Sequence, residues 1–140
     1  MCLILDTNVV VAALRSPYGA SAALVEQALD RQFTLLLSVP LVLEYEATCS
    51  DPNQRIASGL SESEVGTVIS ALCAVAEPVE GWFLWRPQLR DPADEMVLEA
   101  AVNGRADALV TFNSRDFGDV PRTFGVEVLS PRHALRRLTR

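Results

Sequence analysis

The sequence predicts a single α/β domain in which helices cover both faces of a parallel β-sheet. Short apolar runs of strand length alternate along the chain with longer segments whose apolar residues recur at helical spacing. The chain has 140 residues, enough for one domain with a substantial core, and 49% of them are hydrophobic, which argues against disorder. No internal repeat, linker or low-complexity segment divides residues 1–140, so we expect one domain.

The first half of the chain is expected to contain two strands. Residues 2–6 form a short apolar run that ends in Asp6, and residues 33–37 form a second run of the same kind. Between them lies a helical stretch, interrupted around residues 16–19. Ser38 is placed to cap a following helix that carries Glu44.

The second half alternates in the same way. Ser61 and Glu64 fit a capping box at the start of a helix that runs to about residue 76. Asp91 and Pro92 begin another helix, because proline favours the first helical position. The remaining expected features are a loop at 50–53, a short segment at 82–85, a helix end at Asn103-Gly104, strands at 108–111 and 126–129, and a basic helix from Ser130-Pro131.

Residue usage excludes several classes of enzyme. The chain contains no lysine, which excludes a P-loop nucleotide site and a Schiff-base enzyme. The net charge of −6 is unusual for a protein that binds nucleic acid. A group of C-terminal arginines has two interpretations. They could be solvated at a helix end, where cations interact favourably with the negative end of the helix dipole, or they could contact RNA. These are Arg132, Arg136, Arg137 and Arg140.

Nothing in the sequence predicts export or insertion into a membrane. The longest apolar stretches are far shorter than a membrane span, and no basic region or cleavage pattern precedes the first strand. Cys2, Cys49 and Cys73 are an odd number of cysteines without metal-type spacing. They are therefore expected to be reduced thiols in a cytoplasmic protein.

Acidic and amide side chains gather at four places along the chain. Two of these places directly follow predicted strands, at the edge where open parallel sheets bind ligands, and two lie on helices. Converging carboxylates with no lysine to neutralise them would suit a divalent cation such as Mg²⁺ or Mn²⁺. The residues are Asp6, Glu44, Asp91, Asp94, Asn113 and Asp116.

Each of these residues also has a purely structural reading. Asp6 could cap the next helix through the amides of Asn8 or Val9, and Glu44 could lie on a helix surface. Asp91 and Asp94 fit the cap and the third position of a helix, and Asn113 and Asp116 fit a polar loop. Two carboxylates about 4 Å apart repel by about 4 kcal/mol at an effective dielectric near 20. Convergence would therefore require raised pKa values or a bound cation.

A general base other than a carboxylate is hard to find. The single histidine, His133, lies in the predicted C-terminal helix and is expected at the surface. Water activated by a metal and a carboxylate is therefore the expected nucleophile. Thr7 and Asn8 are natural supporting groups or simply turn formers, and Thr111 is a further supporting group. Arg115 either solvates its loop or faces phosphate.

At this point the sequence resembles the PIN-domain ribonucleases, and in particular the VapC-like toxins of toxin–antitoxin pairs. The resemblance covers nearly the whole chain, and the order and spacing of its four markers are highly specific. The markers are Leu3-Ile4-Leu5-Asp6-Thr7-Asn8, Glu44, Arg90-Asp91-Pro92-Ala93-Asp94-Glu95 followed by Leu98-Glu99-Ala100-Ala101, and Leu109-Val110-Thr111-Phe112-Asn113-Ser114-Arg115-Asp116-Phe117.

The resemblance implies a three-layer α/β/α domain, here with four to five parallel strands, and a Mg²⁺- or Mn²⁺-dependent endoribonuclease. Asp6, Glu44 and Asp94 match the three acidic metal ligands of the family. The fourth family position, often aspartate, aligns with Asn113, and Asp116 lies three residues further on as a substitute or as a group that orients water. The resemblance also implies a homodimer and a cognate antitoxin that covers the active site.

Two alternatives to a toxin nuclease stay open. A PIN fold that has lost hydrolysis and binds only RNA or protein is one of them, and Asn113 and the acidic net charge motivate it. A DNA-directed nuclease of the same broad fold is the other, disfavoured by the small size of the chain.

Overall fold

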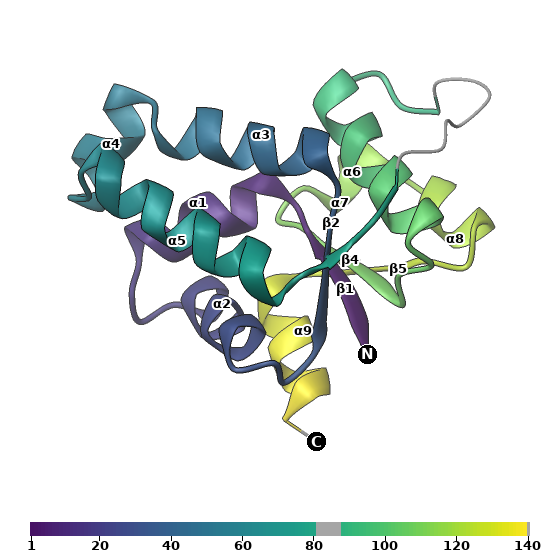
Figure 1. Ribbon diagram of the computed structural model, residues 1–140. Coiled ribbons are helices and arrows are strands. Elements are labelled where there is room, and N and C mark those ends of the chain that lie inside the picture. The colour runs from purple at the N-terminus through teal and green to yellow at the C-terminus, as the bar shows by residue number, and fades with distance from the viewer. Residues whose placement is uncertain (81–87, 140) are drawn as a thin grey trace.

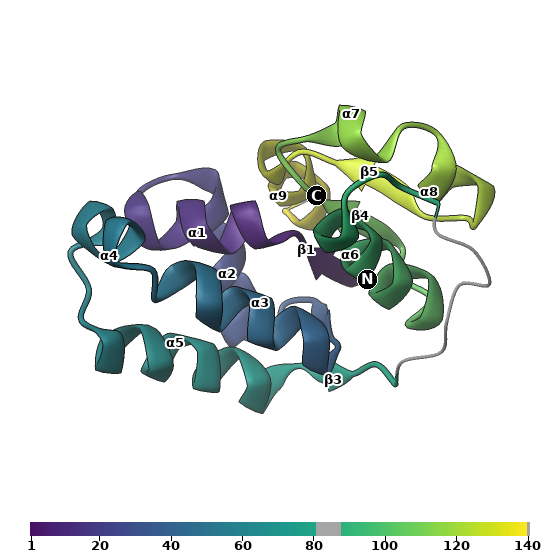
Figure 2. The same ribbon diagram turned by 90° about the horizontal axis from the view of Figure 1, so that it is seen from above.

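The computed structural model, which describes residues 1–80 and 88–139, contains a five-stranded parallel sheet (Figures 1 and 2). The strand order is β3-β2-β1-β4-β5, and every neighbouring pair is parallel, as predicted. The strands are β1 (Cys2–Leu5), β2 (Thr34–Leu37), β3 (Glu77–Pro78), β4 (Ala108–Val110) and β5 (Glu127–Leu129).

The strand order reverses between β1 and β4, and this reversal determines where a ligand can bind. From β1 the chain proceeds through β2 to β3 on one side, and then crosses to β4 and β5 on the other. In open parallel sheets the crevice at such a reversal, beyond the carboxyl ends of the strands, is the usual ligand site. Asp6 follows β1 at this point, where its amide donates to the carbonyl oxygen of Val110 at 2.9 Å.

Helices connect the strands, and four predicted helix starts are confirmed. The hydroxyl of Ser38 accepts from Leu41, Ser61 and Glu64 form a capping box, Asp91 accepts from Ala93, and Ser130 accepts from His133. The longer helices are α1 (Thr7–Arg15), α2 (Ala20–Leu29), α3 (Val39–Cys49), α5 (Glu62–Val75), α6 (Pro92–Asn103) and α9 (Pro131–Leu138).

Three short helices and one strand differ from the prediction. The segment read as a loop at 50–53 contains the start of α4 (Pro52–Ser58), and the polar stretch after β4 forms α7 (Ser114–Phe117) and α8 (Val120–Thr123). The two-residue strand β3 is too short to produce a periodic sequence pattern. The predicted segment at 82–85 lies outside the described residues.

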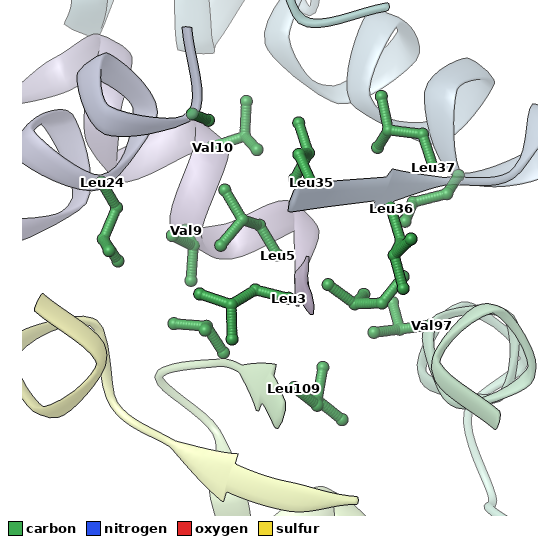
Figure 3. Close-up of a cluster of buried hydrophobic side chains, with 14 of the residues drawn as sticks. Leu3, Leu5, Val9, Val10, Leu24, Leu35, Leu36, Leu37, Val97 and Leu109 are labelled. Atoms are coloured by element: carbon green, nitrogen blue, oxygen red, sulfur yellow. The ribbon is translucent and has the colours of Figure 1, made fainter. Parts of the chain in front are cut away.

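The core lies on both faces of the sheet. α6 packs against β1, β2 and β4, and α9 packs against β5 and α2. Figure 3 shows Val97 of α6 on one side of β1, and Val9 and Leu24 on the other. These side chains and the leucines of β1 and β2 are buried. The structure therefore has the predicted α/β architecture, with helices on both sides of the sheet (Figure 2).

One close approach requires glycine. A Cβ atom at Gly104, where α6 ends, would lie 2.8 Å from Cγ2 of Val79 and 2.9 Å from both Cδ1 of Leu36 and the carbonyl oxygen of Ala100. The end of α6 thus fits against the β2–β3 edge only because this residue lacks a side chain. Among the described residues, no helix is long and apolar enough to cross a membrane.

Candidate active site

Asp6 is held at the carboxyl end of β1 by the neighbouring strand. The residue is 7% exposed, and its Oδ2 accepts a hydrogen bond of 2.6 Å from the hydroxyl of Thr111, which follows β4. The cap that the sequence suggested, through the amides of Asn8 or Val9, is not formed. Val9 donates instead to the backbone oxygen of Asp6. The carboxylate is therefore buried and oriented across the strand reversal, not used to start α1.

Thr111 connects Asp6 to the side chain of Asn8 and to the backbone of Asn113. Its hydroxyl oxygen accepts from the backbone amide of Asn113 at 3.0 Å and from Nδ2 of Asn8 at 3.5 Å. Oδ1 of Asn8 in turn accepts from the amide of Phe112 at 3.5 Å. Because these contacts orient the hydroxyl, its hydrogen points to Asp6 and fixes the rotamer of the carboxylate.

Asp94 faces Asp6 across a cavity of about 620 Å³, which we call the central cavity. Asp94 is half-buried and occupies the third position of α6, as expected from Asp91 at the cap. The central cavity is lined by Asp6, Thr7, Asn8, Val11, Ala12, Arg15, Ser16, Thr48, Gln54, Asp94 and Asn113. The structure thus brings Asp6, Asp94 and Asn113, three of the predicted site residues, to one cavity.

Asp94 also borders a second cavity of about 450 Å³ on the side of α7. Asp91, Asp116 and Arg115 line this neighbouring space, and all three are exposed. Asp94 therefore stands between the two groups of predicted residues, one around Asp6 and one around Asp116. Arg115 lines this neighbouring cavity together with the carboxylates.

Burial and nearby carboxylates raise the pKa of Asp94 and of Asp6. Burial, and then the nearby charges of Asp6, Asp91 and Asp116, together raise the pKa of Asp94 to about 6. Burial likewise raises the pKa of Asp6, although the hydroxyl of Thr111 and a backbone amide at Thr7 oppose the change. Negative charge is thus concentrated where the strand order reverses, which is the arrangement that a cation stabilises.

Glu44 is placed differently from the other predicted ligands. It lies half-buried on α3, and its Oε1 accepts from the hydroxyl of Thr48, one turn further along, at 3.3 Å. Thr48 lines the central cavity, whereas Glu44 is not among the described residues that do so. Glu44 is therefore one hydrogen bond removed from the cavity that Asp6 and Asp94 share.

Sequence reasoning missed the part that Tyr45 plays. This residue, which the sequence did not single out, is fully buried, and its hydroxyl donates to the carbonyl oxygen of Leu5. Burial, then the charge of Asp6, raises the pKa of Tyr45 well above its usual value. Tyr45 thus fastens α3 to the end of β1, directly before Asp6, and its place beside Glu44 gave no sequence signal for this.

Gln54 and Arg15 also line the central cavity and were not predicted. Oε1 of Gln54 is buried and has no hydrogen-bond partner among the described residues. Gln54 belongs to α4, a helix that was not predicted, so its position could not be inferred from the sequence. Its amide adds a polar group to the wall of the central cavity.

The donor chemistry of the central cavity fits a hard divalent cation. Carboxylate, amide and hydroxyl oxygens surround it, and Mg²⁺ prefers oxygen ligands. Within residues 1–80 and 88–139, however, no three acidic, cysteine or histidine side chains are close enough to hold one ion together. Asp6 and Asp94 could hold an ion as a pair, because Mg²⁺ commonly takes one or two carboxylates and completes its shell with water and phosphate oxygens.

The remaining predicted features lie away from this cavity. His133 is exposed on α9, as expected, and the three cysteines are free thiols. The arginines of α9 have different surroundings. Arg137 pairs with Glu127 at 3.1 Å in the last turn, which agrees with the helix-dipole reading, whereas Arg132 lies in the first turn. Arg140 is outside the described residues.

Comparison with protein families identifies this arrangement. A family model described as PIN domain matches residues 2–115, which include both sides of the central cavity. No curated protein matches the chain at a significant level.

Proposed function

Because the chain belongs to the PIN domain family, whose members are generally metal-dependent nucleases, we propose that it is an endoribonuclease that requires Mg²⁺ or Mn²⁺. One observation carries the proposal. Two acidic side chains from different elements, Asp6 and Asp94, share a cavity at the strand reversal, and both have a raised pKa because of burial and nearby carboxylates. Such a pair is poorly stable without a cation and well suited to one.

The residues of the chain divide the work of phosphodiester hydrolysis. Asp6 and Asp94 would hold the cation, and the hydrogen bond from Thr111 fixes the rotamer of Asp6. A bound divalent cation would supply an activated water and stabilise negative charge on the phosphoryl oxygens. Asp116 lines the neighbouring cavity together with Asp94, and it is the residue that would orient that water and take up its proton.

The other predicted residues have smaller parts in this proposal. Asn113, a neutral amide at the edge of the central cavity, orients water or an RNA oxygen, and Arg115 faces the substrate phosphate. Asp91 begins the helix that positions Asp94. Glu44 would act through Thr48, whose hydroxyl donates to it and which lines the central cavity.

Cleavage of single-stranded RNA tests the proposal. The purified protein is incubated with labelled RNA in Mn²⁺ or Mg²⁺, and Asp6→Asn and Asp94→Asn are compared with Asp30→Asn. Asp30 is an exposed acid between α2 and β2, at the amino end of that strand and therefore away from the site. Its variant changes the net charge by the same amount as the other two. We expect EDTA and the first two substitutions to abolish cleavage and Asp30→Asn to leave it unchanged. Full activity in Asp6→Asn would overturn the proposal.

We further propose that the chain is the toxin of a toxin–antitoxin pair and forms a homodimer. This rests on the resemblance of the four sequence markers to VapC-like toxins. Induced expression should arrest growth, and Asp6→Asn should relieve the arrest. A short open reading frame directly upstream that encodes an antitoxin should do the same when co-expressed. Normal growth with soluble wild-type protein would contradict the toxin assignment.

A binding module without hydrolysis is the second candidate. Two observations favour it. A neutral residue, Asn113, occupies the fourth family position, and the central cavity holds two acidic side chains, with no group of three metal-binding side chains among the described residues. A folded protein that binds RNA but shows no metal-dependent cleavage of varied RNA pools would support this candidate over the nuclease.

A further inference from the structure

A separate cavity of about 380 Å³ adjoins the central cavity and has a different chemical character. The two share Ala12 and Ser16, so they are neighbours along α1. This separate cavity, which we call the arginine pocket, lies between the first turns of α2 and α9. Among the described residues that line it, Arg132 alone is charged. The acidic centre therefore borders a pocket whose single lining charge is positive.

The first turn of α2 presents backbone amides to the arginine pocket. Gly19, Ala20 and Ser21 line it, and Gly19 is the cap residue of this ten-residue helix. Glycine has no side chain to accept from the first amides, and no side-chain cap bond is formed at this helix start. The first amides of a helix have no partners within it, and they carry the positive end of the dipole. An anion such as a phosphate accepts hydrogen bonds from these amides and is attracted to the positive end of the dipole.

A buried hydroxyl at the same helix start points independently to a ligand. Ser21 is 4% exposed, and its Oγ has no hydrogen-bond partner among the described residues. Leaving a buried hydroxyl unpaired is unfavourable, and such groups commonly mark a position where a water or ligand belongs. Because Ser21 lines the arginine pocket, an oxygen-rich ligand there would satisfy its hydroxyl.

Arg132 is exposed in a turn of α9 where a bound anion would be favourable. It is the second residue of α9, in the turn where the helix dipole disfavours a cation. Ser130 already caps this helix by accepting from the amide of His133 at 3.1 Å. An anion held between the first turn of α2 and the guanidinium of Arg132 would offset the unfavourable dipole and satisfy donors from both helices.

An exposed aromatic side chain completes the pocket. Phe112 is 55% exposed and lines the pocket directly after Thr111, the residue that orients Asp6. Exposed aromatic faces next to a cationic groove are the usual platforms on which single-stranded nucleic acids stack a base. The pocket thus has donors for a phosphate and a surface for a base, immediately beside the acidic pair.

We propose that the arginine pocket binds the nucleotide next to the scissile phosphate in single-stranded RNA. Its phosphate lies between the first turn of α2 and Arg132, and its base stacks on Phe112. This inference rests on the proposed nuclease function and names the substrate subsite of that same site. It also answers the difficulty of the net charge, since RNA would be held by a local positive pocket while the cation occupies the acidic one.

Binding of RNA without catalysis tests the subsite. A fluorescein-labelled random decamer of single-stranded RNA is titrated with protein in EDTA at about 50 mM salt, and its anisotropy gives Kd. We expect Phe112→Ala to raise Kd about tenfold, from the loss of one stacked base. Arg132→Gln should raise it several-fold and reduce the slope of log Kd against log salt by about one. Arg136→Gln, which removes the same charge from the same helix, should change Kd less than twofold.

Ser21→Ala separates a ligand role from a structural one. If the hydroxyl serves RNA, this substitution raises Kd about threefold while the melting temperature stays equal or increases, because an unpaired buried hydroxyl has been removed. Unchanged Kd in Phe112→Ala and Arg132→Gln overturns the subsite, as does equal weakening by Arg136→Gln or the absence of measurable binding by the wild-type protein.

Metal-dependent cleavage by the same preparations separates the two proposals. If the wild-type protein cleaves RNA and the pocket variants bind and cleave as it does, the subsite is wrong and the nuclease stands. If the variants bind more weakly but no preparation cleaves, the nuclease is wrong and the pocket serves an RNA-binding module.

Discussion

Replacing Asp94 by asparagine should stabilise the metal-free protein at neutral pH. The pKa of Asp94 rises from 3.8 to about 6 in the folded protein. A carboxyl group whose pKa is raised on folding favours the folded state when protonated. That contribution is complete below pH about 4 and is lost as the pH rises through about 6. Asparagine resembles the protonated form at every pH, so the variant keeps the contribution that the wild-type protein loses.

The size of the effect follows from the shift. About 2 pKa units correspond to roughly 3 kcal/mol at 1.36 kcal/mol per unit, which is an upper bound. Asp94 is half-buried, so solvent screening reduces the gain in unfolding free energy to about 1–2 kcal/mol. At about 3 °C per kcal/mol for a domain of this size, the melting temperature of Asp94→Asn should rise by about 3–6 °C at pH 8.

Urea denaturation in EDTA at pH 8 and pH 4 measures this directly. The variant should be more stable than the wild-type protein at pH 8, and the difference should shrink toward zero at pH 4, where both side chains are neutral. Asp30→Asn, the exposed control, should show no such dependence. An Asp94→Asn protein that is less stable at pH 8, or whose stability gain is equal at both pH values, would refute the reasoning.

Three further substitutions test other contacts of the site and its supports. Thr111→Val removes the hydroxyl that lowers the pKa of Asp6, so calorimetric titration should show metal affinity about 10–100-fold weaker, and NMR should show the Asp6 pKa raised further. Unchanged affinity would rule out the orienting role. Tyr45→Phe leaves the buried carbonyl oxygen of Leu5 without its donor, and urea denaturation should show a loss of about 1–2 kcal/mol; a neutral result would contradict that contact. Gly104→Ala forces a Cβ into the 2.8 Å contact at the end of α6 and should destabilise the protein by about 1–3 kcal/mol, whereas an unchanged melting temperature would mean that the helix end shifts freely.

Features decided by short stretches of sequence could be predicted. Four strands were located because each is a short apolar run, and their parallel arrangement followed from the helices between them. The capping box of Ser61 and Glu64, and the helix start at Asp91-Pro92, depend on contacts within three residues. Such contacts are visible in the sequence because both partners are close along the chain.

One local signal was present but not recognised. Asp51-Pro52 begins α4 as Asp91-Pro92 begins α6, with the aspartate accepting from an amide two residues on and proline at the first helical position. The same pair of residues was read as a loop in the first case. The apolar periodicity that supported α6 is absent from this short helix, none of whose residues is buried.

Features that depend on distant contacts could not be predicted from residue patterns. The burial of Tyr45 is decided by a contact with Leu5, forty residues away, and the orientation of Asp6 by Thr111 across the sheet. The convergence of Asp6 and Asp94 was expected from the rule for parallel strand ends and from the family resemblance. The separation of Glu44 from the central cavity was not expected, because the position of a residue in a helix does not by itself show which way its side chain points.

Titration of the metal-free protein with Mn²⁺, followed by calorimetry, tests most directly whether Asp6 and Asp94 hold a cation. The account predicts binding in the wild-type protein and in Asp30→Asn, and its loss in Asp6→Asn and Asp94→Asn with the fold intact. No binding to the wild-type protein at millimolar Mn²⁺, or equal binding by all four proteins, would contradict the account and favour a PIN fold that binds without hydrolysis.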